Sequence, residues 1–385
     1  MSMTSRERVT AVLNHDIPDR VPIIIGASNA TGIKMGTYRK LKQLISVEAP
    51  DRYLYDWPEL GTAAVDEATL QRLHSDVRPI LDSHPQSTWD ANANRQPGDP
   101  FIDSWGIGQV ELAPGEWFPH INPLANAKTI AELDAFNWPD MNDPTRVAGV
   151  KAAAAKLAAY NQYAIMATPW LLFPFERAIQ MQRMDTFMIN MVERPDFALA
   201  LLEKITALCK QLMGHFLREL GDHVDIIKIG DDLGTQESLL ISPKMYRRLL
   251  KPFHADYIAF IKAHTNAKLL FHTDGDVFPL IDDFIEMGVD ILNPIQTSAG
   301  RMSQLGELKK RFGKNIIFCG GIDTHQILPF GTPAQVRQEV RRVIEALGSG
   351  GGYMLASVHT IMNDVPPENV LAMVDAVEEY GRYPR

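Results

Sequence analysis

The stretch 267–275, AKLLFHTDG, ends a run of apolar residues with a histidine and an aspartate two positions apart, and a glycine follows. Side chains two positions apart on a β-strand point to the same face of the sheet, so His272 and Asp274 share a face if this run is a strand. Gly275 would then end the strand. The pattern predicts a buried strand that carries two polar side chains at its carboxyl end.

Runs of the same kind recur along the chain. They are VPIIIG (21–26), YLYDWP (53–58), YAIMATP (163–169), VDIIKIGDD (224–232), AKLLFHTDG (267–275), DILNPIQ (290–296), NIIFCGGID (315–323) and GYMLASVH (352–359). Amphipathic helical patterns separate the later runs, for example over residues 242–264, where Ser242 is a helix cap and Pro243 fits the first turn. Eight apolar runs that alternate with helices predict a (β/α)₈ TIM barrel, and an open doubly wound α/β sheet is the alternative.

The alternation is interrupted between about residues 59 and 150, where proline, glycine and aromatic residues accumulate. We interpret this segment as an N-terminal insertion that covers the mouth of one barrel domain spanning residues 1–385. Trp89, Trp105 and Trp117 are candidate lid residues. The alternative is that these tryptophans form the small core of the insertion itself.

The composition is that of an ordinary globular protein, with 45% hydrophobic and 22% charged residues. A net charge of −9 without a block of lysine or arginine argues against nucleic acid or an anionic membrane as a partner. No segment approaches the roughly 18 apolar residues of a membrane span, and the first residues do not resemble a signal peptide. The two cysteines, Cys209 and Cys319, offer no disulfide framework, so we expect a cytoplasmic protein with a small-molecule substrate.

Barrels of this class form their active sites at the carboxyl ends of the strands. Polar or reactive residues occupy many of the predicted strand ends. They are Ser28, Tyr55, Asp56, Trp170, Asp231, Asp232, His272, Asp274, Asn293, Gln296, Cys319, Asp323 and His359. Because an unpaired buried carboxylate is costly, carboxylates in apolar strands need partners, and a shared site supplies them.

His272, Asp274 and His359 form the candidate metal site. The spacing of the first two residues alone does not distinguish metal ligands from a histidine that bonds a neighbouring carbonyl or carboxylate. His359, at the end of the eighth predicted strand, supplies a third ligand. Two histidines and one carboxylate would leave coordination positions open for water or substrate.

Other residues at the strand ends are candidates for catalysis and substrate binding. Asp231 and Asp232 in GDDLGTQ could act with His359 as catalytic groups, and the alternative for the aspartates is to cap the turn that follows them. The candidate substrate-binding residues are Tyr55, Trp170, Asn293 and Gln296. The sequence has no phosphate-binding loop, no dinucleotide-binding glycine motif after the first strand and no serine nucleophile elbow.

Several longer segments carry a resemblance to a known family. They are TSRERVTAVLNHDIPDRVP (4–22), DDLGTQESLLISPKMYRRLLKPF (231–253), LLFHTDGDVFPLIDDFIEMGVDILNPIQ (269–296), CGGIDT (319–324), GTPAQVRQEVRRVIEALGSGGGYMLA (331–356) and NDVPPENVLAMVDAVEEYG (363–381). In them the chain resembles the uroporphyrinogen decarboxylase superfamily, and more closely its branch of cobalamin- or corrinoid-linked methyltransferases. The resemblance implies a (β/α)₈ barrel.

The resemblance implies two different chemistries. The decarboxylases hold substrate carboxylates with an arginine-rich motif after the first strand, where this chain has GASNATG (26–32), so decarboxylation of the porphyrinogen is not expected. The methyltransferases carry a His-x-Cys motif on the fifth strand and a further ligand near the end of the eighth, which together hold zinc. His272 and His359 match two of these ligands, whereas Asp274 stands in place of the cysteine. His359 also matches an active-site histidine of the decarboxylases.

From the residues and the resemblance together, we expect a metal-dependent enzyme with zinc as the metal and a corrinoid as methyl donor or acceptor. Its substrate would be a small oxygen-bearing, methoxylated compound. A corrinoid protein as partner and a homodimer are both compatible with the resemblance. The alternatives are a metal-assisted lyase or decarboxylase of a small aromatic or hydroxy acid, and a non-catalytic carrier of a corrinoid or tetrapyrrole. The sequence lacks the corrinoid-ligating DxHxxG segment that a carrier would need.

Overall fold

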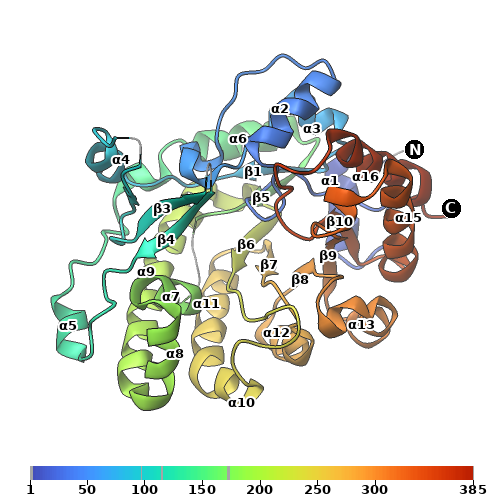
Figure 1. Ribbon diagram of the computed structural model, residues 1–385. Helices are drawn as coiled ribbons and strands as arrows, with labels where there is room; N and C mark the ends of the chain where they lie inside the picture. Colours follow the sequence, from blue (N-terminus) through green and yellow to red (C-terminus); the bar gives the residue numbers. More distant parts are fainter. Residues whose placement is uncertain (1–2, 97, 114–115, 171–173, 385) are drawn as a thin grey trace.

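The computed structural model describes residues 3–96, 98–113, 116–170 and 174–384. A parallel sheet in the order β1-β5-β6-β7-β8-β9-β10 curls around a central axis, and helices surround it (Figure 1). Its strands are β1 (Val77–Ile80), β5 (Ala164–Ala167), β6 (Ile226–Gly230), β7 (Lys268–His272), β8 (Ile291–Ile295), β9 (Ile317–Ile322) and β10 (Tyr353–Ser357).

Residues 21–26 take the place of the remaining strand and close the sheet. Ile23 forms a parallel bridge with Leu355 of β10, and the N–H of Ile24 donates to the carbonyl of Leu355 at 2.8 Å. On the opposite side, the N–H of Asp76 donates to the carbonyl of Ile23 at 2.9 Å. The fold is therefore an α/β barrel of the (β/α)₈ type, and the predicted fold class is confirmed.

The second strand does not lie where the sequence predicts it. Residues 53–58 are not a strand, because Leu54–Asp56 is a short 3₁₀ helix in which Tyr55 and Asp56 have φ of 59° and 52°. Such left-handed backbone interrupts an extended chain. The second barrel strand is β1, which lies inside the range 59–150 that sequence analysis assigned to the insertion.

A small antiparallel sheet lies beside the barrel, between β1 and β5 in the chain. Its strands, in the order β2-β3-β4, are β2 (Phe101–Ile102), β3 (Gly108–Ala113) and β4 (Glu116–Ile121). Trp105 is buried there, with its ring 6.4 Å from that of Trp138. Trp89 packs on Phe101 at 5.8 Å. Trp105 therefore belongs to the main hydrophobic core, and Trp89 packs against a smaller aromatic cluster.

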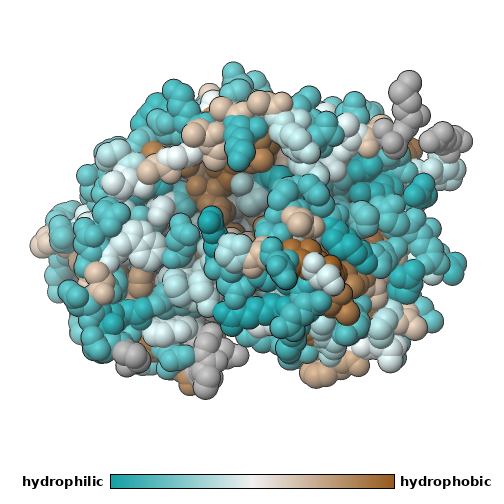
Figure 2. Space-filling model, turned by 90° about the horizontal axis from the view of Figure 1, so that it is seen from above, coloured by the Kyte–Doolittle hydropathy of each residue, from teal (hydrophilic) through white to brown (hydrophobic). Residues whose placement is uncertain are grey.

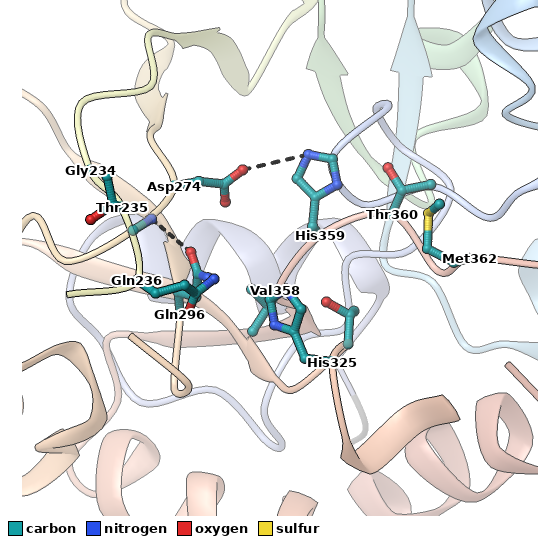
Figure 3. Close-up of a pocket in the computed structure, with 12 residues that line it drawn as sticks. Gly234, Thr235, Gln236, Asp274, Gln296, His325, Val358, His359, Thr360 and Met362 are labelled. Atoms are coloured by element: carbon teal, nitrogen blue, oxygen red, sulfur yellow. Dashed lines mark hydrogen bonds and ion pairs between the residues drawn. The ribbon is translucent and has the colours of Figure 1, made fainter. Parts of the chain in front are cut away.

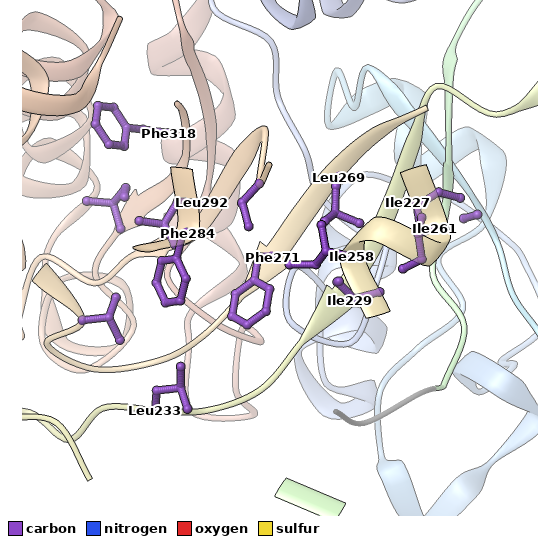
Figure 4. Close-up of a cluster of buried hydrophobic side chains, with 14 of the residues drawn as sticks. Ile227, Ile229, Leu233, Ile258, Ile261, Leu269, Phe271, Phe284, Leu292 and Phe318 are labelled. Atoms are coloured by element: carbon purple, nitrogen blue, oxygen red, sulfur yellow. The ribbon is translucent and has the colours of Figure 1, made fainter. Parts of the chain in front are cut away.

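Helices pack on the outer surface of the barrel and at its ends. They are α1 (Ser5–Leu13), α2 (Met35–Leu44), α3 (Glu67–Arg72), α4 (Gln86–Asn92), α5 (Ile130–Ala135), α6 (Val150–Tyr160), α7 (Pro174–Gln182), α8 (Met184–Glu193), α9 (Pro195–Leu220), α10 (Pro243–Met245), α11 (Lys251–His264), α12 (Ile281–Met287), α13 (Leu305–Phe312), α14 (Ile327–Phe330), α15 (Pro333–Val343) and α16 (Pro367–Tyr380). In Figure 4, Phe271 of β7 and Leu292 of β8 lie among the apolar side chains of α11 and α12, including Ile258 and Phe284.

Helix α1 plugs the amino end of the barrel. Its Val9 and Val12 are fully buried in one cluster with the inward-facing Ile226 of β6 and Leu270 of β7. The predicted capping box at Thr4 is present and starts this helix. The interior is thus filled with apolar side chains at the amino end, which leaves the carboxyl end for polar groups.

Asp76, the residue before β1, connects the plug helix to the closing segment. Its carboxylate accepts hydrogen bonds from Arg8 Nη1 at 2.6 Å, Arg20 Nη1 at 2.9 Å and the N–H of Ile23 at 2.8 Å. The side chain of Asp76 is fully buried, and the two arginines are nearly so. Without Asp76, Arg8 would keep only the partly exposed Asp19 as an ionic partner, and Arg20 only the partly exposed Glu378.

No helix in the described ranges is both long enough and apolar enough to cross a membrane. The face in Figure 2 is mostly hydrophilic, and hydrophobic residues gather there only in small patches.

We expect Asp76→Ala to lower the free energy of unfolding by about 3–5 kcal/mol, because Arg8 and Arg20 would keep their charges in a buried place without their shared partner. Urea denaturation followed by circular dichroism measures the change. Asp134→Ala, which removes an exposed carboxylate from α5, is the matched control and should change the free energy little. Equal effects of the two substitutions would contradict this role of Asp76.

Candidate metal centre and its pocket

His272, Asp274 and His359 come together at the carboxyl end of the barrel. One candidate ligand atom from each residue lies within 4.8 Å of the other two. The Nε2 atoms of His272 and His359 each lie 3.7 Å from Asp274 Oδ2. In Figure 3, Asp274 and His359 point toward one another across the pocket. The three residues selected from the sequence therefore form one cluster.

Backbone geometry at two glycines positions the cluster. Gly275 has a φ of +91°, and a Cβ there would lie 2.3 Å from the backbone of Gly234, so the loops that follow β6 and β7 are in direct backbone contact. At Gly230, the register partner of His272, a Cβ would lie 2.8 Å from the Cβ of His272. Larger residues at either position would displace the loop that carries Asp274 or the ring of His272.

Hydrogen bonds orient the ring of His272. Its Nδ1 lies 2.8 Å from Oδ1 of Asn293, and Nδ2 of Asn293 donates to the carbonyl of Cys319 at 3.4 Å. This second bond directs the amide oxygen toward His272, so that a neutral ring would carry its proton on Nδ1. The lone pair on Nε2 then faces Asp274 and His359, which is the arrangement of a metal-binding imidazole with its supporting hydrogen bond.

The donor set fits a divalent metal ion. Oδ1 of Asp274 is buried and has no hydrogen-bond partner in the part of the chain that the structure describes. A buried carboxylate oxygen normally has a partner, and a cation would provide one. Two imidazole nitrogens and a carboxylate oxygen are ligands that zinc accepts in sites with an open position.

The charges in the cluster depend on one another. Burial opposes the charged form of His272, but the Asp274 carboxylate outweighs it and raises the pKa of His272. Burial also acts against ionised Asp274, yet the neighbouring histidines, His272 first, lower its pKa to about 2. Burial lowers the pKa of His359. Asp274 is therefore an anion across the physiological range and His359 a neutral ring.

The two adjacent aspartates have different surroundings. Asp231 is fully buried, and its carboxylate accepts hydrogen bonds from the N–H groups of Phe175 at 3.1 Å and Glu176 at 2.7 Å. Nε2 of His254 lies 2.9 Å from the same carboxylate. Asp231 thus holds the first turn of α7 in place, which agrees with a structural role better than with the predicted catalytic one.

Asp232 faces the cluster. Its Oδ1 accepts a hydrogen bond from the N–H of Asp274 at 3.0 Å. Burial, and next the negative charge of Asp274, raise the pKa of Asp232, while His272 opposes the rise. Of the two aspartates, Asp232 is the one whose place allows proton transfer at the site.

A pocket of about 540 Å³ lies next to the cluster. Thr235, Gln236, Gln296, His325 and Met362 contribute to its lining, together with Asp274 and His359. Oε1 of Gln296 accepts a hydrogen bond from the N–H of Gly275 at 2.6 Å, which leaves its Nε2 to donate. The predicted place of Gln296 at the substrate pocket therefore agrees with its geometry.

The other three residues predicted to bind substrate do not line this pocket. Asn293 is fully buried, and its amide is used by His272 and Cys319, so it orients a cluster residue instead. The hydroxyl of Tyr55 donates to the carbonyl of Thr168 at 2.8 Å, and the ring of Tyr55 meets that of Trp170 at 5.3 Å.

Tyr55 and Trp170 belong to a cluster of aromatic rings beside the barrel. Trp57 is buried between Trp170 and His84, at ring separations of 5.3 and 4.8 Å. Nε2 of His84 is buried and has no hydrogen-bond partner among the described residues. Burial, with the positive charges of Arg146 and Arg177, lowers the pKa of His84 to about 3. The cluster therefore keeps this ring neutral.

Two charged residues of the site have no counterpart in the sequence analysis. Lys228 lies on β6, and burial lowers the pKa of its ammonium although Glu176, Asp232 and Asp274 oppose this. Burial, followed by the charge of Asp232, raises the pKa of Glu176 well above its ordinary value. A lysine within the apolar run VDIIKIGDD was a local signal for the first residue. Glu176 reaches the site only through the packing of α7, which leaves no local signal.

This barrel, with its polar centre at the carboxyl ends of the strands, has the architecture of a TIM-barrel enzyme. The chain belongs to the uroporphyrinogen decarboxylase (URO-D) family, whose model matches residues 103–380. The predicted family is thereby confirmed.

Curated proteins agree with this assignment, and a solved structure shares the fold. Uroporphyrinogen decarboxylase of Neisseria meningitidis serogroup C is 25% identical over 202 residues, which cover 51% of this chain and 52% of that protein. The enzyme of the same name from Actinobacillus succinogenes is 37% identical over 78 residues, 20% of this chain and 22% of that one. The chain thus matches about half the length, or less, of these relatives. A methyltransferase from Methanosarcina mazei has the same fold, with a TM-score of 0.66 and 17% identity over 98% of this chain and 99% of that one.

We expect Asn293→Ala to weaken zinc binding about 10- to 100-fold, because the ring of His272 would lose the hydrogen bond that sets its tautomer and orientation. Competition with a chromophoric chelator measures the affinity. Asn315→Ala, on the exposed turn before β9, is the control. Unchanged affinity in Asn293→Ala would show that His272 does not depend on this bond.

His84→Phe should make stability less dependent on pH between about 6.5 and 3. Between these pH values the unfolded chain binds a proton on His84 and the folded chain does not, so acidification destabilises the native protein. Above pH 6.5 neither state binds this proton. Phenylalanine removes that proton, and the slope of the unfolding free energy should fall by up to about 1.4 kcal/mol per pH unit. Urea titrations at pH 7, 6, 5 and 4.5 test this, with exposed His223→Phe as control. Parallel curves for His84→Phe and the wild type would refute it.

Proposed function

We propose that the protein is a zinc-dependent methyltransferase that removes a methyl group from a small methoxylated substrate and passes it to a corrinoid. The observation that carries this proposal is the cluster of His272, Asp274 and His359, whose ligand atoms lie within 4.8 Å of one another and include a buried, unpartnered carboxylate oxygen. Family membership supports an enzyme rather than a carrier. The fold shared with a methyltransferase is compatible with methyl transfer.

His272, Asp274 and His359 would hold the metal, and zinc bound there would supply Lewis acidity to stabilise the oxyanion left when the methyl group departs. Asn293 keeps Nε2 of His272 directed at the cluster. The raised pKa of Asp232 lets its carboxyl group hold a proton to a higher pH than an ordinary aspartate does, for delivery to the departing oxygen. Nε2 of Gln296 would donate to the substrate from the pocket wall.

Asp274 is the residue that distinguishes this site from the zinc-thiolate pattern implied by the family resemblance. A carboxylate is a harder ligand than a thiolate and donates less charge to the metal. A metal bound by two imidazoles and a carboxylate therefore remains more electrophilic. This property suits the activation of an ether oxygen better than the activation of a thiol.

The second candidate function is a metal-assisted lyase or decarboxylase of a small aromatic or hydroxy acid. The name shared by the family and by its curated relatives supports it. The same acid, base and metal-binding groups would serve such a reaction. Residues 26–32 contain no arginine, so the porphyrinogen itself remains an unsuitable substrate.

Purified wild-type protein should contain about one zinc ion per chain, and His272→Ala should lose most of it, because two ligands hold zinc far more weakly than three. Plasma mass spectrometry measures the metal. His325→Ala is the matched control, since His325 lines the same pocket but lies outside the cluster. Wild-type protein without stoichiometric metal would refute the proposed function.

Incubation with cob(I)alamin and methoxybenzoates then separates the two candidates. Methyl transfer should produce the visible spectrum of methylcobalamin, and Asp274→Cys should retain zinc yet lose activity toward ethers. Zinc-loaded protein that transfers no methyl group but releases carbon dioxide from a small acid would favour the second candidate.

A further inference from the structure

Lys228 lies inside the barrel, directly beneath the candidate metal centre. On β6 it shares a face with Ile226, which belongs to the interior cluster, and its register partner on β7 is the inward-facing Leu270. Two residues further on, Gly230 pairs with His272. Because Gly230 has no side chain, nothing from β6 covers Lys228 on the side of the centre. The lysine is thus one layer of side chains below His272.

The ammonium of Lys228 forms no hydrogen bond within the described residues, although Glu176, Asp232 and Asp274 act on it electrostatically. Each of these carboxylates has other contacts. Asp274 Oδ2 faces the two histidines of the cluster, Asp232 Oδ1 accepts from the N–H of Asp274, and Glu176 Oε1 accepts from Gln180 Nε2 at 3.5 Å.

Lys228 is only partly buried, so the three donors of its ammonium, which no described protein group accepts, are open to water or to a ligand. A ligand that supplies acceptors of negative charge would complete this environment. The pocket of about 540 Å³ that Asp274 and His359 line has room for a small organic molecule. Lys228 does not line this pocket and lies one layer of side chains below His272.

We propose that Lys228 binds the carboxylate of a small monocarboxylic acid, which makes an anionic substrate the preferred one. The carboxylate lies on Lys228 at the floor of the site, and the oxygen-bearing part of the molecule is directed upward to His272, Asp274 and His359. This inference deepens the proposed function by naming the substrate class, and only the reaction at the upper end rests on that function. Lys228 is a specificity-determining residue in either candidate reaction.

Isothermal titration calorimetry on the intact, zinc-supplemented chain tests the proposal. The probes are 3-methoxybenzoate and its neutral analogue anisole. Wild-type protein should bind the acid more tightly, and Lys228→Met should weaken binding of the acid by roughly ten- to a hundredfold, the loss expected for a charged hydrogen bond, while leaving anisole unchanged. Lys228→Arg should restore much of the affinity for the acid.

Lys268→Met is the matched control, because Lys268 lies on the neighbouring strand β7 and pairs with Asp290 at 3.7 Å, away from the pocket. It should bind both probes as the wild type does. Circular dichroism and zinc content, measured on the same samples, identify variants with a disturbed fold or centre.

Three results would overturn the proposal: equal affinity of Lys228→Met and wild type for the acid, an equal loss for acid and ether, or a wild type that does not prefer the acid. An equal loss would mean that Lys228 only balances the charges of its three carboxylate neighbours. A protein that lacks zinc but still prefers the acid through Lys228 would refute the proposed function and leave this inference standing.

Discussion

The closure of the barrel depends on the buried carboxylate of Asp76. Residues 21–26 are too irregular to hold β10 and β1 together by a full ladder of hydrogen bonds, and the ionic group formed with Arg8 and Arg20 compensates for this. The same group fixes α1 in the amino end of the barrel. Only a closed barrel brings the end of β7 and the segment after β10 together, since β8 and β9 separate them in the sheet. The ionic group of Asp76, Arg8 and Arg20 at the amino end of the barrel therefore helps to keep His272 and His359 close together at the carboxyl end.

Most of the fold could be predicted from the sequence because parallel strands buried on both sides form continuous apolar runs. The prediction was wrong at residues 53–58, whose aromatic and apolar composition equals that of a strand. Tyr55 and Asp56 adopt left-handed backbone there so that the aromatic rings can pack on Trp170. The real strand β1 has only four residues, one of them proline, so its pattern is too short to be distinguished.

Part of the candidate site could likewise be predicted from the sequence, and part could not. His272 and Asp274 could be found because their spacing predicts that both side chains face the same way, although β7 ends at His272 and Asp274 lies in the loop that follows. His359 could be found because it comes shortly after the end of another strand. The different roles of Asp231 and Asp232 could not be predicted from the sequence. The two side chains point in opposite directions, and only the packing of α7 decides which of them caps that helix. The sequence predicts that Asn293 binds substrate, but the register of β7 with β8 places its side chain against His272.

Two features at different depths of the barrel favour the same kind of substrate. At the upper level, Asp274 in place of a thiolate leaves a bound metal electrophilic and suited to oxygen ligands. One layer below, Lys228 presents a positive charge whose donors no protein group among the described residues accepts. In the proposed site, the first feature would select for oxygen at the reacting end of a molecule and the second for negative charge at its other end.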